Sequence, residues 1–181
     1  DVQGKKDNEV IFEGDRLQYS YRNSPGQWRG IHLIRESKDN QIDYAIIKNA
    51  TIGIQVDSLP ITSNPNLRIS NTIIRNMSNY GIVGLTANIK AENCLIHSCG
   101  FQNFAGFFGG VYDIRHCTFF GFSSQSNSHI EPVFSINNFQ TDGNVIIRTF
   151  DVQYTLLNNI MYGTLENEVT FSFAPDRPPL P

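Results

Sequence analysis

A short repeat runs through most of the chain. Five segments of eight residues carry the same order of apolar, small and turn-forming residues, and they begin at Ile42, Ile69, Ala91, Ile114 and Val152. Their starts lie 27, 22, 23 and 38 residues apart, so the unit is 22 or 23 residues long, with insertions near 57–65 and 123–144. Such a period is typical of proteins built from stacked supersecondary units.

Each unit is too short for the two strands and helix of a βαβ crossover, which needs about 30 residues or more. Charged residues make up only 17% of the chain, whereas β-branched residues and asparagine, which disfavour helices, are abundant. The unit is therefore predicted to be one coil of a solenoid with two or three short strands. Stacking the coils about 4.8 Å apart joins their strands into parallel sheets and places equivalent residues in columns.

The columns of the alignment indicate which residues face the core. The first and sixth positions are apolar in all five segments, and the eighth carries Asn, Ser or Gly, which predicts a turn. The fourth position is small and includes Cys94 and Cys117, predicted to stack as free structural thiols on adjacent coils. Because the total of three cysteines is odd, a disulfide framework and a four-ligand zinc site are not expected.

Segments outside the repeat indicate which kind of solenoid the chain resembles. The stretches 10–17, 25–31 (Pro-Gly-Gln-Trp-Arg-Gly-Ile) and 157–169, together with the coils, resemble the right-handed, single-stranded parallel β-helix of the pectate-lyase-like superfamily. Within it, the chain is similar to uncharacterised β-helix lipoproteins of the Bacteroidetes cell envelope, from about Gly4 to Phe173. The resemblance implies an all-β fold, a cell-envelope or extracellular location and a longer parent protein with a lipoprotein signal and upstream β domains.

The sequence predicts one β-helix domain over residues 1–174, with regular coils from about Val10, and a Pro-rich tail over 175–181. The stretch Asp1–Glu9 is polar, so we expect an open edge at the N-terminal coil, which associates with other chains or is covered by an upstream domain of the parent protein. No apolar run reaches the roughly 20 residues that span a bilayer. A net charge of −3 argues against nucleic acid as a partner.

The residues give no assembled catalytic site. In the family that the chain resembles, pectate lyases use a calcium-binding Asp cluster with an Arg or Lys base, and polygalacturonases use Asn-Thr-Asp, paired Asp and Gly-His-Gly motifs. The chain contains none of these polygalacturonase motifs, and its acidic candidates fall in different columns: Asp43, Glu92, Asp113 and Asp151. Glu92 is predicted to face Arg115 as an exposed ion pair. No catalytic residue, metal site or cofactor is predicted.

Four residues are candidates for ligand binding. Lys48, Arg75 and His97 share the seventh position of consecutive coils, and they are predicted to form either a solvated edge or a groove for an acidic glycan. Trp28 either stacks on a sugar or packs as a core or cap aromatic. The insertion 123–144 is long enough to carry binding residues. The remaining histidines lack metal-ligand spacing and are interpreted as structural or solvated: His32, His116 and His129.

These observations favour a non-catalytic surface scaffold or glycan-binding module. The alternative is a polysaccharide lyase or glycoside hydrolase whose site is completed by loops or by parts of the protein outside this sequence. Such an enzyme would require two or more carboxylates, or an Asp cluster with Arg or Lys, on one face. A third hypothesis is binding of another envelope protein at the open strand edges.

Overall fold

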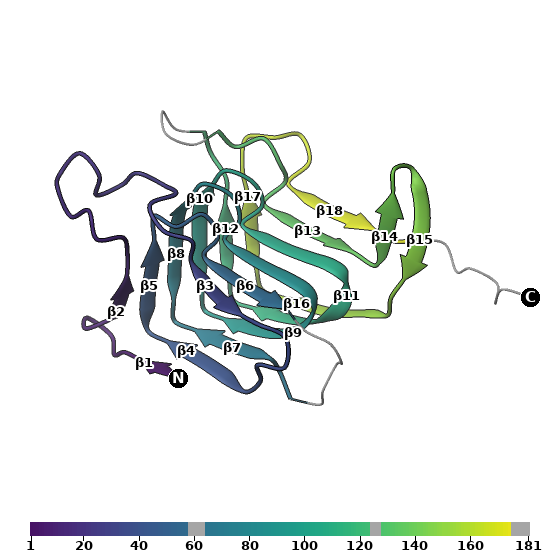
Figure 1. Ribbon diagram of the computed structural model, residues 1–181, viewed down its shortest axis with the longest axis horizontal. Coiled ribbons are helices and arrows are strands. Elements are labelled where there is room, and N and C mark those ends of the chain that lie inside the picture. Colours follow the sequence, from purple (N-terminus) through teal and green to yellow (C-terminus); the bar gives the residue numbers. More distant parts are fainter. Residues whose placement is uncertain (58–63, 124–127, 175–181) are drawn as a thin grey trace, which may run out of the picture.

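The computed structural model describes residues 1–57, 64–123 and 128–174, which contain strands, turns and loops and no helix (Figure 1). Two parallel sheets of ten and six strands surround one apolar core, and a two-stranded antiparallel hairpin is added to them. The all-β prediction is thereby confirmed, and the long parallel sheets are consistent with a β-solenoid. In the described ranges, no helix is long and apolar enough to cross a membrane.

The strands lie on three faces. Face I is the six-stranded sheet, which contains β2 (Val10–Phe12), β5 (Ala45–Lys48), β8 (Ile73–Met77), β10 (Leu95–Cys99), β12 (Thr118–Phe120) and β17 (Ile160–Tyr162). Faces II and III form the ten-stranded sheet, because β9 (Ile82–Glu92) and β11 (Phe104–Arg115) run through the bend between them. Face II also contains β3 (Ile31–Leu33), β6 (Ile54–Asp57), β13 (Phe134–Asn137) and β18 (Val169–Ser172). Face III also contains β1 (Val2–Gln3), β4 (Asn40–Asp43), β7 (Leu67–Ser70) and β16 (Val152–Leu157).

The insertion predicted over 123–144 is not a single loop. It contains the coil strand β13, followed by the start of a hairpin between β14 (Phe139–Asp142) and β15 (Val145–Thr149). The hairpin therefore interrupts the coil between face II and face III. Part of each predicted insertion, and the Pro-rich tail over 175–181, lie outside the described residues.

Alternation of buried and outward side chains builds each face. The first-position residues Ile42, Ile69, Ala91 and Ile114 are buried in line, as predicted. At the sixth position, Ile47, Ile74, Ile96 and Phe119 are fully buried on face I. At the eighth position, Asn49, Asn76 and Ser98 have the positive φ typical of turn residues, but Asn76 and Ser98 lie within β8 and β10.

The register of the fifth repeat differs from the prediction. Val152 pairs with Gly110, and the partner of Ile114 is Leu156, so the predicted fifth segment is displaced by four residues. The strands also begin earlier than predicted. β1 pairs with β4, and Val2 lies beside Ile42. The polar stretch before Val10 thus contributes a strand to the first coil.

The cysteines lie where the columns place them. Cys94 and Cys117 are buried free thiols on adjacent coils, and the amide of Thr118 donates to the carbonyl oxygen of Cys94 at 2.8 Å. The hydrogen bond with Cys117 and burial raise the pKa of the Cys94 thiol. Burial raises the pKa of Cys99 to about 12. Thiolates are the reactive form of cysteine, so Cys94 and Cys99 act as small core side chains. The hydrogen bond with Cys94 lowers the pKa of Cys117, and this thiol is buried as well.

Candidate functional site

The predicted basic column exists, but its side chains already have protein partners. Lys48, Arg75 and His97 are direct neighbours on β5, β8 and β10. Lys48 Nζ lies 2.7 Å from a carboxylate oxygen of Glu13, and Arg75 Nη1 donates to Asn23 Oδ1 at 3.4 Å. Burial, and next to it the charge of Arg75, lower the pKa of His97. As ligand-binding residues the three stay a prediction, and the loop that follows β2 supplies partners to two of them.

Trp28 lies against the core. Its indole N–H donates to the carbonyl oxygen of Lys48 at 2.9 Å, its backbone bridges Ala50, and its ring packs on the buried apolar residues. This environment matches the core or cap interpretation, because the polar edge of the ring is already bonded to the protein.

The predicted facing of Glu92 and Arg115 is seen in the strand register. The guanidinium of Arg115, however, bonds the carboxylate of Asp113 at 2.6 Å on its own strand. Among the described residues, no three His, Cys, Asp or Glu side chains are grouped so that they could hold a metal ion.

A groove of about 190 Å³ lies on the outer side of face II, and we call it the polar groove. Ser135 pairs with Thr170, and Asn137 pairs with Ser172, so outward positions of β13 and β18 form a polar patch. The groove is completed by residues of the segments that precede β11 and β13. Its lining includes two amides, three hydroxyls, one carboxylate and one aromatic ring, from Gln102, Asn137, Ser135, Thr170, Ser172, Glu131 and Phe107.

Two polar atoms of this lining have no partner. Gln102 Oε1 and Ser135 Oγ are buried and form no hydrogen bond within the described part of the chain. The Gln102 residue as a whole is only 8% exposed. A buried polar group without a partner costs about 1–3 kcal/mol. These atoms therefore favour a ligand that can donate hydrogen bonds to them.

Aromatic rings adjoin the polar groove. The ring centroid of Phe107 lies 6.0 Å from that of Tyr80, which in turn lies 5.5 Å from that of Phe101. Burial, with a contribution from the negative charge of Glu131, raises the pKa of Tyr80. The negative charge of Glu131 thus influences the Tyr80 hydroxyl of this aromatic cluster.

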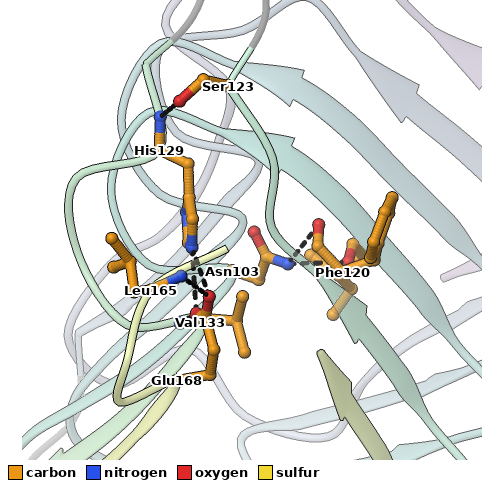
Figure 2. A network of polar contacts seen from close by, with 8 residues as sticks. Asn103, Phe120, Ser123, His129, Val133, Leu165 and Glu168 are labelled. Carbon is orange, nitrogen blue, oxygen red and sulfur yellow. Dashed lines mark hydrogen bonds and ion pairs between the residues drawn. The ribbon is translucent and has the colours of Figure 1, made fainter. Parts of the chain in front are cut away.

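A buried network holds the segment that carries Glu131 (Figure 2). His129 Nε2 lies 2.9 Å and 3.0 Å from the two carboxylate oxygens of Glu168, and the His129 side chain is fully buried. The amides of Val133 and Leu165 donate to the same carboxylate at 3.2 Å and 2.7 Å. Glu131 lies two residues from both His129 and Val133, so the network fixes its segment on either side.

Sequence reasoning did not find the polar groove as a whole, although the insertion predicted over 123–144 supplies Glu131, Ser135 and Asn137. Its residues come from separate coils and share no motif or spacing. Of the two alternatives for His129, structural or solvated, the buried side chain fits the structural one, but its partner Glu168 could not be identified from 39 residues away. Of the other histidines, His32 Nε2 lies 2.6 Å from Asp57, and His116 is exposed at a corner.

Comparisons of the chain with protein-family models, with curated proteins and with solved structures found no match.

Proposed function

We propose that the protein is a non-catalytic β-helix module that binds the neutral part of a glycan in the polar groove. The buried, unpartnered Gln102 Oε1 and Ser135 Oγ carry this proposal. Once the Gln102 and Ser135 side chains rotate toward the groove, sugar hydroxyls can donate to both atoms and accept from neighbouring groups. The apolar face of a sugar ring can pack on Phe107. A concave site with a few convergent polar groups and an aromatic surface is a common form of small-ligand site.

We also propose the finer fold and the location that the family resemblance implies. The coil is right-handed, because connections between parallel strands of one sheet are right-handed in about 98% of cases. The chain is then a right-handed, single-stranded β-helix of the pectate-lyase-like kind, exposed on the cell envelope or outside the cell. A rigid scaffold of this kind would present the polar groove to glycans at the surface.

Two other hypotheses are less well supported: an acidic-glycan site at the basic column, and an enzyme. At the basic column, the carboxylate of Glu13 already neutralises Lys48, which leaves less positive charge for an acidic glycan. A lyase or glycoside hydrolase remains the alternative function. Glycosidases typically use two carboxyl groups about 5–10 Å apart. Among the described residues that line the polar groove, Glu131 is the single carboxylate.

Isothermal titration calorimetry against a panel of neutral and acidic polysaccharides tests the proposal. A neutral glycan should bind, and Glu131→Gln should weaken its binding at least about tenfold, because a hydrogen bond to a charged group is worth about 1.5–3 kcal/mol. Thr170→Val should weaken it several-fold. The matched control is Thr118→Val on face I, which makes the same chemical change outside the groove.

Two results would contradict the proposal. One is that Glu131→Gln and Thr170→Val bind every glycan as tightly as the unsubstituted protein does. The other is release of shortened or unsaturated sugars from the bound polysaccharide, which would favour the enzyme alternative.

A further inference from the structure

A second hollow, of about 340 Å³, adjoins the polar groove, and we call it the arginine hollow. It lies where the bend between faces II and III meets the β14–β15 hairpin. Figure 1 shows this hairpin at the right, beside β11. Its lining includes Arg35, Asp57, Phe108, Gln140, Arg148 and Phe150. The amide of Phe108 donates to Oδ1 of Asn137, a residue of the polar groove, at 2.9 Å. The two sites are therefore neighbours.

The arginine hollow carries positive charge that the described residues do not fully neutralise. Within the described residues, neither Arg35 nor Arg148 lies within ion-pair distance of a carboxylate. Asp57 also lines the hollow and offsets part of this charge; its oxygens lie 2.6 Å from His32 Nε2 and 2.8 Å from Gln55 Nε2. With two arginines against one aspartate, the lining keeps a net positive charge in a chain whose net charge is −3.

The backbone and one aromatic contact fix the walls of the hollow. The guanidinium of Arg148 lies 4.8 Å from the ring centroid of Phe150, an arrangement that limits the directions in which it can point. Thr86 and Phe108 both have left-handed backbones, with φ of 53° and 62°. The Thr86 hydroxyl donates to the carbonyl oxygen of Phe108 at 2.9 Å and so joins two coils. Such conformations are uncommon for a β-branched or bulky residue and persist only where the surroundings enforce them.

A run of half-buried aromatic rings joins the two sites. Ring centroids are separated by 6.0 Å from Tyr80 to Phe107, by 6.3 Å from Phe107 to Phe108 and by 6.0 Å from Phe108 to Phe150. A chain of sugar rings lying in the polar groove could continue over these side chains. Its far end would then meet the two arginines.

We propose that the arginine hollow binds an oxyanion group, such as a sulfate or carboxylate, attached to the glycan whose neutral part occupies the polar groove. The inference rests on the proposed function for the identity of the ligand. Guanidinium groups suit this role, because their planar N–H donors match an oxyanion bidentately and they stay charged at every physiological pH.

The test uses three polymers with one backbone: dextran, carboxymethyl dextran and dextran sulfate. Affinity electrophoresis at about 0.15 M ionic strength limits long-range attraction between exposed charges. One or both charged polymers should retard the protein more than dextran does, and the polymer that does so identifies the preferred oxyanion. The double variant Arg35→Gln/Arg148→Gln should lose at least tenfold in affinity for it.

The control is Arg29→Gln/Arg68→Gln, which removes the same two charges from exposed positions outside the hollow. Equal losses in the two double variants, or no added retardation by either charged polymer, would overturn the arginine site. If the arginine variant alone loses binding while Glu131→Gln and Thr170→Val bind every neutral glycan normally, the arginine site stands and the proposed function of the polar groove fails.

Discussion

At the residue scale, the corners of the coil place unusual demands on single side chains. The corner between faces III and I has a left-handed backbone in each of five coils, at Tyr44, Asn71, Asn93, His116 and Asn158. Asparagine tolerates this conformation, and here it also bonds between coils, since Asn93 Nδ2 donates to Asn71 Oδ1 at 2.7 Å. Stacked backbone hydrogen bonds hold tyrosine and histidine in the same conformation, because each corner repeats the one below it.

A second residue-scale effect concerns protonation of His97. Burial and Arg75 lower its pKa in the folded protein from the ordinary value of 6.5. The unfolded chain therefore binds a proton at a pH where the folded protein does not, and stability falls as the pH falls through about 6.5. His97→Gln should reduce this loss. Urea unfolding midpoints at pH 5.5 and 7.5 measure it.

His116→Asn provides the control for His97→Gln. His116 is exposed at a corner with φ of 54°, which asparagine can adopt. This variant should keep the pH dependence of the original chain. An unchanged pH dependence in His97→Gln would show that the environment of His97 does not contribute to it.

At the element scale, the last two coils depend on one buried hydrogen-bonded pair, His129 and Glu168. Glu168 receives the amides of Leu165 and Val133, while His129 anchors the segment that leads to β13. Glycine at 121 and 163 makes room for this arrangement, because a Cβ at Gly121 would meet the His129 ring and one at Gly163 would meet the Glu168 carboxylate. These contacts position the polar groove, because β13 and β18, which line it, both begin beside them.

Glu168→Gln tests this dependence. A glutamine side chain has one carbonyl oxygen in place of two carboxylate oxygens, so a buried N–H group loses its acceptor, at a cost of about 1–3 kcal/mol. Chemical denaturation should show that loss of stability, and glycan binding should weaken in parallel because the Glu131 segment is released. Glu166→Gln, an exposed neighbour, should change neither quantity. If Glu168→Gln and Glu166→Gln behave alike, the network does not position the groove.

The sequence predicted the elements better than their exact pairing. Apolar alternation and coil-sized spacing identified the first four repeats, because those coils stack with few interruptions. The fifth repeat was displaced by four residues, and an even displacement leaves alternation intact, so Val152 and Leu156 fit an inward position equally well. The β14–β15 hairpin lengthens the unit before the fifth repeat, so the regular coil-sized spacing could not decide whether Val152 or Leu156 follows Ile114. The columns Ser135–Thr170 and Asn137–Ser172 become visible only once strands β13 and β18 are placed.

At the scale of the whole molecule, burial falls toward the ends of the stack. Ile74 and Ile96, in the middle coils, are fully buried, whereas Tyr154 and Phe171, in the last coil, are 45% and 39% exposed. Phe171 contacts Phe134 of the coil before it, at 6.2 Å between ring centroids, and it stacks on Tyr154 at 5.0 Å. Exposed apolar side chains are more numerous at the C-terminal end than at the N-terminal coil. Association through the N-terminal coil stays a prediction.

Because the stability of a stacked-coil protein is nearly a sum of coil and neighbour terms, end coils should open at lower free energy than middle ones. Hydrogen exchange followed by mass spectrometry should therefore find the amides of β8 and β10 slowest to exchange, and those of β2, β17 and β18 faster. A saturating neutral glycan should then slow exchange in β18 and not in β2, since the ligand would bridge Ser135 on β13 and Thr170 on β18. Equal protection of β18 and β10 without ligand would contradict the stacked-coil account, and equal slowing of β2 and β18 would show that the glycan binds outside the polar groove.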